Sequence, residues 1–350
     1  MPTVQAEDLR QLGAACFEKV SVPTDEATLT ARLMVEANLV GHDSHGMRQL
    51  SRYVSRIEEG LIVAGAPTET VRETPVTALL DGHHNLGYVA AARATQKAIA
   101  MAQQTGLSAV GVRNLNHVGR IGAYPEMIAA AGLVGLVTVN VQARGILVAP
   151  FGGLQARLGT NPFGAAFPRN GNPPILLDFA TSAVAANKVR QAKSREKPAG
   201  EGWLQDAAGA PTTDPQAFID GQATLLPLGG TEGYKGYALG VMVDILSGIL
   251  AGAGSAVTDQ RDINNGTFII CIDPKAFLDD AQYQSELDAL VAHLKNTSPR
   301  PGHTGVELPG EYEHNNRVAR TRDGIPIESP VWEDIAACAT RLGVPLPKAD

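Results

Sequence analysis

Cysteine is scarce in this sequence, and its copies are too far apart to form a recognisable motif. There are three, Cys16, Cys271 and Cys338, with no CxxC spacing. A disulfide framework needs a larger even set of cysteines, and a thiolate zinc site needs closely spaced pairs. The sequence therefore predicts neither kind of site, and it fits a reducing compartment.

Positive charge is also in the minority. Lysine and arginine number 29 against 36 acidic residues, which gives a formal net charge of -7. Proteins that bind the phosphate backbone of nucleic acids need clustered cations, and the longest basic cluster here covers only residues 188–197. We therefore expect no nucleic-acid partner.

Two further features that the sequence lacks concern membranes. Residues 1–8 have no basic segment followed by an apolar one, so we predict no signal peptide and a cytoplasmic location. Residues 236–257 are apolar enough for a membrane span, but Asp244 lies in this segment and glycines interrupt it. A central carboxylate is costly in lipid, so we predict no membrane association. Instead, residues 234–250 should form a buried helix with one apolar stripe, made of Tyr237, Val241, Ile245 and Ile249.

The apolar patterns that are present predict an α/β protein. Helical spacing at both ends predicts helices over 6–19, 24–39 and 330–342. Short apolar runs between them predict strands at 77–82, 107–112, 133–139, 175–179 and 267–272. Further helices are predicted at 88–104 and 122–131. Because a strand, a helix and a strand follow one another over 107–139, we expect a parallel crossover unit there.

This order of elements predicts two domains. The helices at the two ends, residues 1–75 and 309–350, should form a helical domain that carries part of the active site. Residues 76–308 should form an α/β domain that binds a cofactor.

One stretch near the N-terminus gathers chemically active side chains, Gly41-His42-Asp43-Ser44-His45-Gly46. Helical spacing from Met47 to Ile57 predicts a helix that begins at Asp43 or Ser44, with His45 in its first turn. Imidazole titrates near neutral pH, so this cluster could transfer a proton. A helix cap with a solvated histidine remains an alternative.

A second histidine, His117, follows the predicted strand at 107–112 in the sequence Asn116-His117-Val118-Gly119-Arg120-Ile121-Gly122. Ligands of open α/β sheets bind at the carboxyl ends of strands, which favours a functional role. A third candidate is the glycine-rich loop 229–236, where Lys235 could bind an anion at a helix N-terminus.

Several motifs that would define other functions are missing. No GxGxxG sequence follows a strand, and no Walker A sequence occurs, so an ordinary Rossmann fold is not expected. His42, Asp43 and His45 could suggest a metal site, but no further ligand lies at suitable spacing, so we predict none.

Seven short motifs together indicate a family. In order along the chain they are Gly41 to Gly46, Asn116 to Gly122, Ala149-Pro150-Phe151-Gly152-Gly153, Leu158 to Phe163, Asp178-Phe179-Ala180-Thr181-Ser182, Gly233 to Tyr237 and Leu308-Pro309-Gly310-Glu311. This series resembles the type 2 malate/L-lactate dehydrogenase family of nicotinamide-dependent oxidoreductases, and it is most similar to the hydroxycarboxylate dehydrogenase B branch.

The resemblance implies a non-Rossmann α/β fold, a homodimer, and NAD or NADP as cofactor. It implies His45, His117 and Ser44 as catalytic residues and Tyr53 as part of the substrate site. The implied cofactor contacts are Asp178, Phe179, Ala180, Thr181, Ser182, Ala183, Val184, Lys235, Gly236, Pro309, Gly310 and Glu311.

One position departs from the family pattern. Many members carry an arginine five residues after the serine, where this chain has Gln49 and places Arg48 one position earlier. On a helix this shift turns the side chain by about 100°. We assign Arg48 and Gln49 to the substrate site and leave open which group binds the carboxylate.

The expected activity is hydride transfer between NAD(P)H and C2 of a small 2-oxo or 2-hydroxy carboxylate. The sequence does not decide whether His45 or His117 carries the proton. A reductase of cyclic imines or of diketo sugar acids, with the same site, is the alternative. From other classes, a metal-dependent hydrolase and a catalytically silent binding protein also remain.

Overall fold

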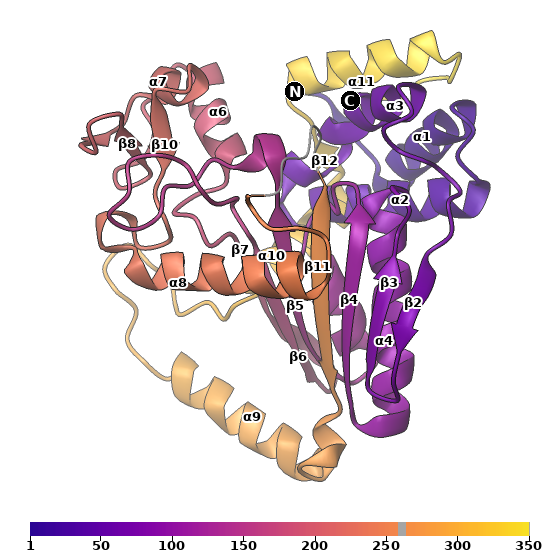
Figure 1. Cartoon of the computed structure of the whole chain (residues 1–350), viewed down its shortest axis with the longest axis vertical. Coiled ribbons are helices and arrows are strands. Elements are labelled where there is room, and N and C mark those ends of the chain that lie inside the picture. Colours follow the sequence, from indigo (N-terminus) through magenta and orange to yellow (C-terminus); the bar gives the residue numbers. More distant parts are fainter. Residues whose placement is uncertain (258–263, 350) are drawn as a thin grey trace.

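A mixed sheet of seven strands forms the centre of the protein (Figure 1). The computed structural model describes residues 1–257 and 264–349. The strand order is β2-β3-β4-β11-β5-β6-β7. The bounds are β2 (Glu69–Glu73), β3 (Thr77–Asp81), β4 (Leu107–Leu115), β11 (Asn265–Ile272), β5 (Val134–Val141), β6 (Phe163–Arg169) and β7 (Asn172–Phe179). Helices cover the sheet, so the predicted α/β class is confirmed.

The predicted parallel crossover over 107–139 is confirmed in strand direction, because β4 and β5 are both antiparallel to the same strand, β11, and therefore run parallel to each other. β4, α5 (Ala123–Ala130) and β5 follow one another as expected, but β11 lies between the two strands, so they do not pair directly. The directly paired parallel strands are β3 and β4, which α4 (Gly87–Thr105) connects. Local patterns predicted β4 and β5 correctly, but they contain no information about a strand inserted from more than 120 residues further along.

Helices pack on both faces of the sheet. α4 and α5 cover one face, and α8 (Tyr234–Val243) with the π-helix Asp244–Leu250 covers the other. The predicted buried stripe is wrong, because Ile245 and Ile249 are 48% and 62% exposed. Ser247 and Asp244 face the sheet instead and hydrogen-bond to Thr138 and Asn140 of β5. Because these β5 side chains are polar, the polar side of the helix packs against the sheet and the apolar side is exposed.

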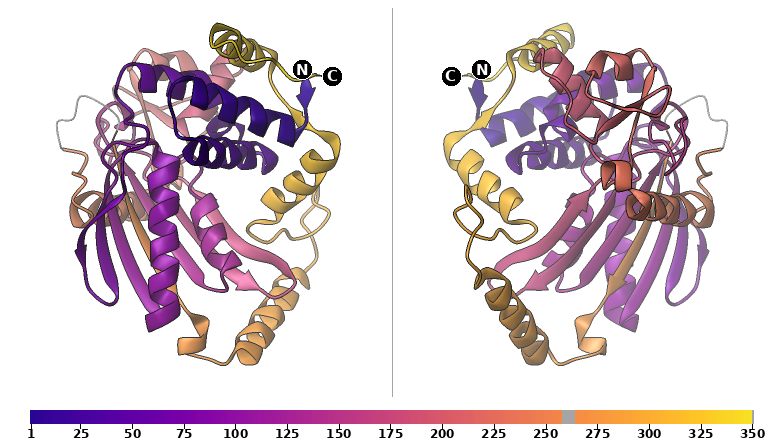
Figure 2. Two further views of the ribbon diagram at one scale, coloured as in Figure 1. Left: turned by 90° about the vertical axis from the view of Figure 1, so that its right-hand side faces the viewer. Right: turned by 90° about the vertical axis from the view of Figure 1, so that its left-hand side faces the viewer.

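The two ends of the chain form one helical layer at the same end of the sheet (Figure 2). It contains α1 (Ala6–Lys19), α2 (Thr24–Leu39), α3 (Leu50–Glu58), α10 (Glu311–Asp323) and α11 (Ser329–Arg341), and β1 (Thr3–Val4) pairs with β12 (Ile325–Pro326). The helices predicted at 6–19, 24–39 and 330–342 are confirmed to within one residue. The division into domains at residues 75 and 308 stays a prediction.

A smaller unit lies beside the sheet and has its own core. Its elements are α6 (Ala186–Ser194), β8 (Leu204–Asp206), β9 (Pro211–Thr212), α7 (Pro215–Ile219) and β10 (Ala223–Leu225). Val189, Leu204 and Phe218 are buried within it. α9 (Asp280–Lys295) leads from β11 toward α10 and has no buried residue. In the described part of the chain, no helix is long and apolar enough to span a membrane.

Candidate active site

His45 lies at the end of a short 3₁₀ turn, not in the first turn of an α-helix as predicted. Two such turns, Asp43–His45 and Met47–Gln49, precede α3. The Asn38 side chain lies against Gly46, where a Cβ would come within 2.1 Å of Oδ1. That oxygen accepts the Met47 amide at 2.8 Å, and Nδ2 donates to Asp43 at 2.7 Å. Asn38 therefore holds the two turns that position His45.

His117 lies in the loop after β4, as predicted. This loop packs directly against the start of α4, because a Cβ on Gly87 would come within 2.1 Å of the Asn116 carbonyl oxygen. The Asn116 side chain donates to the His84 carbonyl at 2.7 Å. The backbone that carries His117 is thus held from both sides.

The two histidine rings stack on each other, although 72 residues separate them in sequence. Their centroids are 5.7 Å apart and the planes are inclined by 14°. Ser44 Oγ lies 2.9 Å from His45 Nδ1, and the Tyr53 hydroxyl lies 2.5 Å from His117 Nδ1. The Tyr88 hydroxyl donates to the His45 carbonyl at 2.8 Å. The structure therefore brings together the predicted residues His45, His117, Ser44 and Tyr53.

Both imidazoles are neutral at neutral pH. Burial, with the electrostatic interaction with His42 adding to it, lowers the pKa of His45 to about 4. Burial and the neighbouring His45 hold the pKa of His117 well below its usual value. Burial also raises the pKa of the Tyr53 hydroxyl, which stays protonated. The site therefore contains two imidazoles that can accept protons and a tyrosine that can donate a hydrogen bond.

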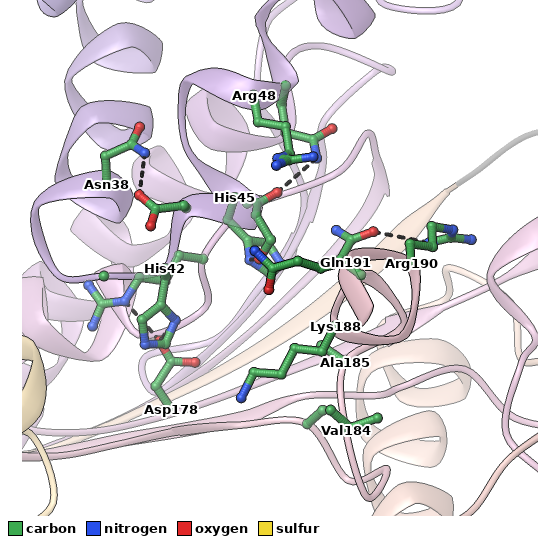
Figure 3. Close-up of a pocket in the computed structure, with 18 of the residues that line it drawn as sticks. Asn38, His42, His45, Arg48, Asp178, Val184, Ala185, Lys188, Arg190 and Gln191 are labelled. Carbon is green, nitrogen blue, oxygen red and sulfur yellow. Dashed lines mark hydrogen bonds and ion pairs between the residues drawn. The ribbon is translucent and has the colours of Figure 1, made fainter. Parts of the chain in front are cut away.

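His45 faces a cavity of about 980 Å³ between the helical layer, the end of β7 and α6. Figure 3 shows His42, His45 and Arg48 on one side of it, and Lys188, Arg190 and Gln191 on the other. Ligand sites usually measure about 300–1,000 Å³. This cavity is at the upper end of that range, which suits a ligand larger than a simple acid.

The cavity is positively charged, although the whole chain is negative. Three carboxylates face it, from Asp43, Asp178 and Glu328, against six cations, from Arg48, Arg120, Lys188, Arg190, Arg195 and Arg320. Within the described residues, Lys188 and Arg190 have no carboxylate partner. Burial, with the charge of Arg52 adding to it, lowers the pKa of Arg190. Such a surface attracts anionic ligands.

The proposed cofactor residues are not all in one place. Asp178, Phe179 and Ala180 line the cavity, as do Ser182, Ala183 and Val184. The Thr181 hydroxyl is buried and donates to the carbonyl of Asn161 at 2.9 Å. Lys235 and Gly236 do not line the cavity, but Gly236 packs against Leu228, which does.

The last group of predicted cofactor contacts lies behind β7. Pro309 and Glu311 line a second cavity of about 470 Å³, and Gly310 packs against Leu176. Glu311 pairs with Lys295 at 2.6 Å. The adjacent Tyr312 reaches the first cavity.

Gln49 and Arg48 both line the cavity, but they bind different partners. Gln49 is buried, and its Nε2 donates to the Ser44 carbonyl at 2.8 Å while its Oε1 accepts from Arg52 at 3.3 Å. Gln49 thus holds the backbone of the serine before His45. Arg48 points into the cavity, where it pairs with Glu328.

The sequence did not predict a buried charge network beside the histidines. The Arg120 side chain is 1% exposed and pairs with Asp178 at 2.8 Å and Glu126 at 2.7 Å. His42 Nε2 lies 3.0 Å from Glu313, and its Nδ1 lies 3.7 Å from Asp178. Arg120 belongs to a motif noted above, but its partner Asp178 is 58 residues away. Only the three-dimensional arrangement reveals the pairing.

Replacing Arg120 with methionine is expected to destabilise the fold by about 3–5 kcal/mol, because the buried Asp178 carboxylate would lose its guanidinium partner, whereas Glu126 would keep Arg317 at 3.0 Å. Unfolding in urea measures this as a lower midpoint. The matched control is Arg322→Met, at a surface arginine that pairs with Asp323, and its midpoint should equal that of the wild type. Equal midpoints for both variants would show that Arg120 does not stabilise the site.

Comparison with known proteins agrees with this geometry. The profile of the malate/L-lactate dehydrogenase family matches residues 4–336. Hydroxycarboxylate dehydrogenase B of Escherichia coli K12 is 38% identical over 97% of this chain and 94% of its own. The L-lactate dehydrogenase of Cupriavidus necator is 37% identical over 97% and 98%.

Comparison with solved structures points to the same family. The structure of a putative malate/lactate dehydrogenase from E. coli superposes with a TM-score of 0.91, at 36% identity over 98% of this chain and 96% of that one. The fold is thus shared with proteins that are named dehydrogenases. The chain belongs to the malate/L-lactate dehydrogenase family.

Proposed function

We propose that this protein transfers a hydride between NAD or NADP and C2 of a small 2-oxo or 2-hydroxy carboxylate. The observation that carries this proposal is the pair of stacked, neutral histidines beside a large cationic cavity. A site of this kind can bind an anionic substrate and exchange one proton with its oxygen. The printed names of the relatives, which include L-lactate dehydrogenase, support the same reaction type.

The cavity fits a dinucleotide. Its volume of about 980 Å³ exceeds the needs of a small acid, and Lys188 and Arg190, which have no carboxylate partner among the described residues, suit a diphosphate. When bound, the nicotinamide ring would supply or accept the hydride. We propose residues 178–184 as the wall that holds the cofactor. Lys235, Gly236 and residues 309–311 stay proposed contacts on the family resemblance.

The sheet supports cofactor binding outside a Rossmann fold. Among the neighbouring strands in the described part of the chain, only the β3–β4 pair is parallel, and no glycine fingerprint follows a predicted strand in the sequence. A Rossmann domain needs both a mostly parallel sheet and that fingerprint.

His45 is the group we propose for proton transfer. It lines the cavity and is oriented by Ser44, whereas His117 lies behind it and is bonded to Tyr53. In the oxidation direction, neutral His45 takes the proton from the substrate hydroxyl. In the reduction direction, protonated His45 gives a proton to the oxygen of the 2-oxo acid. His117 and Tyr53 hold the ring of His45 in place by stacking and hydrogen bonding.

The variant Tyr53→Phe should lower kcat by about tenfold with little change in KM, because it removes the hydrogen bond that orients His117. Steady-state kinetics in both directions measures this. The ring of phenylalanine keeps the packing against Tyr88, so the fold should be retained. A rise in KM with an unchanged kcat would instead place Tyr53 in substrate binding.

We also propose that the protein is a cytoplasmic homodimer, as the family resemblance implies. The exposed apolar residues Met242, Ile245, Ile249 and Leu250 on one helical face support a covered surface. Sedimentation equilibrium tests this proposal, and a single monomeric species at micromolar concentration would contradict it.

The proposed activity is tested with a panel of 2-oxo acids and cyclic imino acids, each assayed with NADH and with NADPH. The panel also decides the cofactor preference. Turnover of a 2-oxo acid with stoichiometric consumption of the reduced cofactor supports the proposal. Turnover of imines alone would replace it with an imine reductase, and loss of activity with a chelator would point to a metal enzyme.

A further inference from the structure

One carboxylate in the cavity, Glu328, accepts hydrogen bonds from three side chains, two of which are cationic. Glu328 lies directly before α11, and its oxygens accept hydrogen bonds from Arg48, from Arg195 at 2.7 Å and from Gln191 at 2.9 Å. All four residues line the cavity that His45 faces.

The donors come from two separate elements. Arg48 belongs to the 3₁₀ turn that follows His45, whereas Gln191 and Arg195 lie in and just after α6. Partial burial opposes ionisation of Glu328, but the hydrogen bonds from Arg195 and Gln191 and the charge of Arg48 hold its pKa below the usual value. The ionised carboxylate thus holds two guanidinium groups and one amide in the geometry that any acidic group would require.

An acid group of a ligand could also displace the Glu328 carboxylate from its partners. The side chains of Arg48, Arg195 and Glu328 are 40%, 54% and 30% exposed, and ion pairs at such exposure contribute little because water screens them. The pair between Arg120 and Asp178 is different, because the Arg120 side chain is 1% exposed. An acid group of a ligand can therefore exchange with Glu328 at little net cost, but it cannot exchange with Asp178.

The position of Arg48 relates this site to the reacting carbon. Arg48 follows His45 by three residues, and both side chains face the same space (Figure 3). A substrate with its oxo group at His45 and a second acid further along would meet the cations held by Glu328. A substrate with only one acid would leave Glu328 in place.

We propose that Arg48, Gln191 and Arg195 form the subsite for the second acidic group of a 2-oxo diacid, and that Glu328 occupies this subsite until the substrate displaces it. The second group is a carboxylate or a sulfonate, since both present several oxygens to a guanidinium. The inference rests on the proposed dehydrogenase function and specifies its substrate class.

The experiment measures one ratio, kcat/KM for oxaloacetate divided by kcat/KM for pyruvate. This ratio is compared between the wild type and the variants. Glu328→Gln removes the competing charge and should raise the ratio by about tenfold, mainly through a lower KM for oxaloacetate. Arg195→Gln removes one cation and should lower the ratio by about tenfold. Glu333→Gln, at an exposed acid on α11, is the matched control and should leave the ratio unchanged.

The proposal requires the two variants to move the ratio in opposite directions. No movement, or movement in the same direction, would overturn it. If Glu328→Gln does not fold, Arg195→Gln decides alone, because that side chain is more than half exposed. A wild type that reduces neither these acids nor any other 2-oxo acid would refute the proposed function instead, which is a separate outcome.

Discussion

Replacing His45 with glutamine is expected to lower kcat for reduction of a 2-oxo acid by about 100- to 10,000-fold, the usual contribution of a general acid. Glutamine can replace a hydrogen bond to Ser44, but it cannot carry the proton. Consumption of NADH or NADPH in single-turnover experiments measures the effect on the chemical step. Binding of the reduced cofactor, followed by its fluorescence, should change little.

Two further variants make this result interpretable. His117→Gln should have a smaller effect than His45→Gln, because His117 acts through its stacking on His45. His293→Gln is the control for a histidine outside the site, since it lies exposed on α9. Near-normal rates for both His45→Gln and His117→Gln would refute the proposed proton transfer.

The second large effect is the dependence of the reaction on pH. The pKa of His45 in the free protein is lowered to about 4. Above this pH the protonated fraction falls about tenfold for each pH unit. Reduction needs the protonated ring, so kcat/KM for the 2-oxo acid should fall continuously by about tenfold per unit from pH 5 to 8.

Oxidation should show the opposite behaviour. It needs neutral His45, which is the main form above about pH 5, so kcat/KM for the hydroxy acid should be flat from there to neutrality. A histidine with its usual pKa of about 6.5 would instead give a plateau for reduction below pH 6 and a loss of oxidation in the same range. Observation of that pattern would show that His45 is not buried as the structure has it.

Local sequence predicted much of the scaffold. The helices at 6–19 and 24–39 and the strand at 77–81 depend on the spacing of neighbouring apolar residues, and the structure has them at these positions. The pairing of β4 and β5 with β11 depends on a contact across more than 120 residues, so no local pattern could show it. The predicted burial of Ile249 is wrong for a related reason. The polar residues of β5 determine which side of the helix is buried, and they lie far from the helix in sequence.

The candidate site, like the fold, could be predicted from the sequence only in part. Chemical type and position in the chain singled out His45, His117 and Ser44, the family resemblance added Tyr53, and these side chains do meet. The sequence did not predict the roles of Arg120 and Glu328, because Asp178 lies 58 residues from Arg120 and the donors to Glu328 lie 133 or more residues away. A single arginine or glutamate carries no signal of this kind until the fold brings its partners together.

The most direct test of the central claim compares the wild type with His45→Gln in one assay of reduced-cofactor oxidation, with a 2-oxo acid as the acceptor. We predict that the wild type forms one 2-hydroxy acid for each cofactor oxidised, and that the variant binds the cofactor but turns over at least about 100-fold more slowly. Equal rates for the two proteins, or no oxidation with any 2-oxo acid, would contradict it.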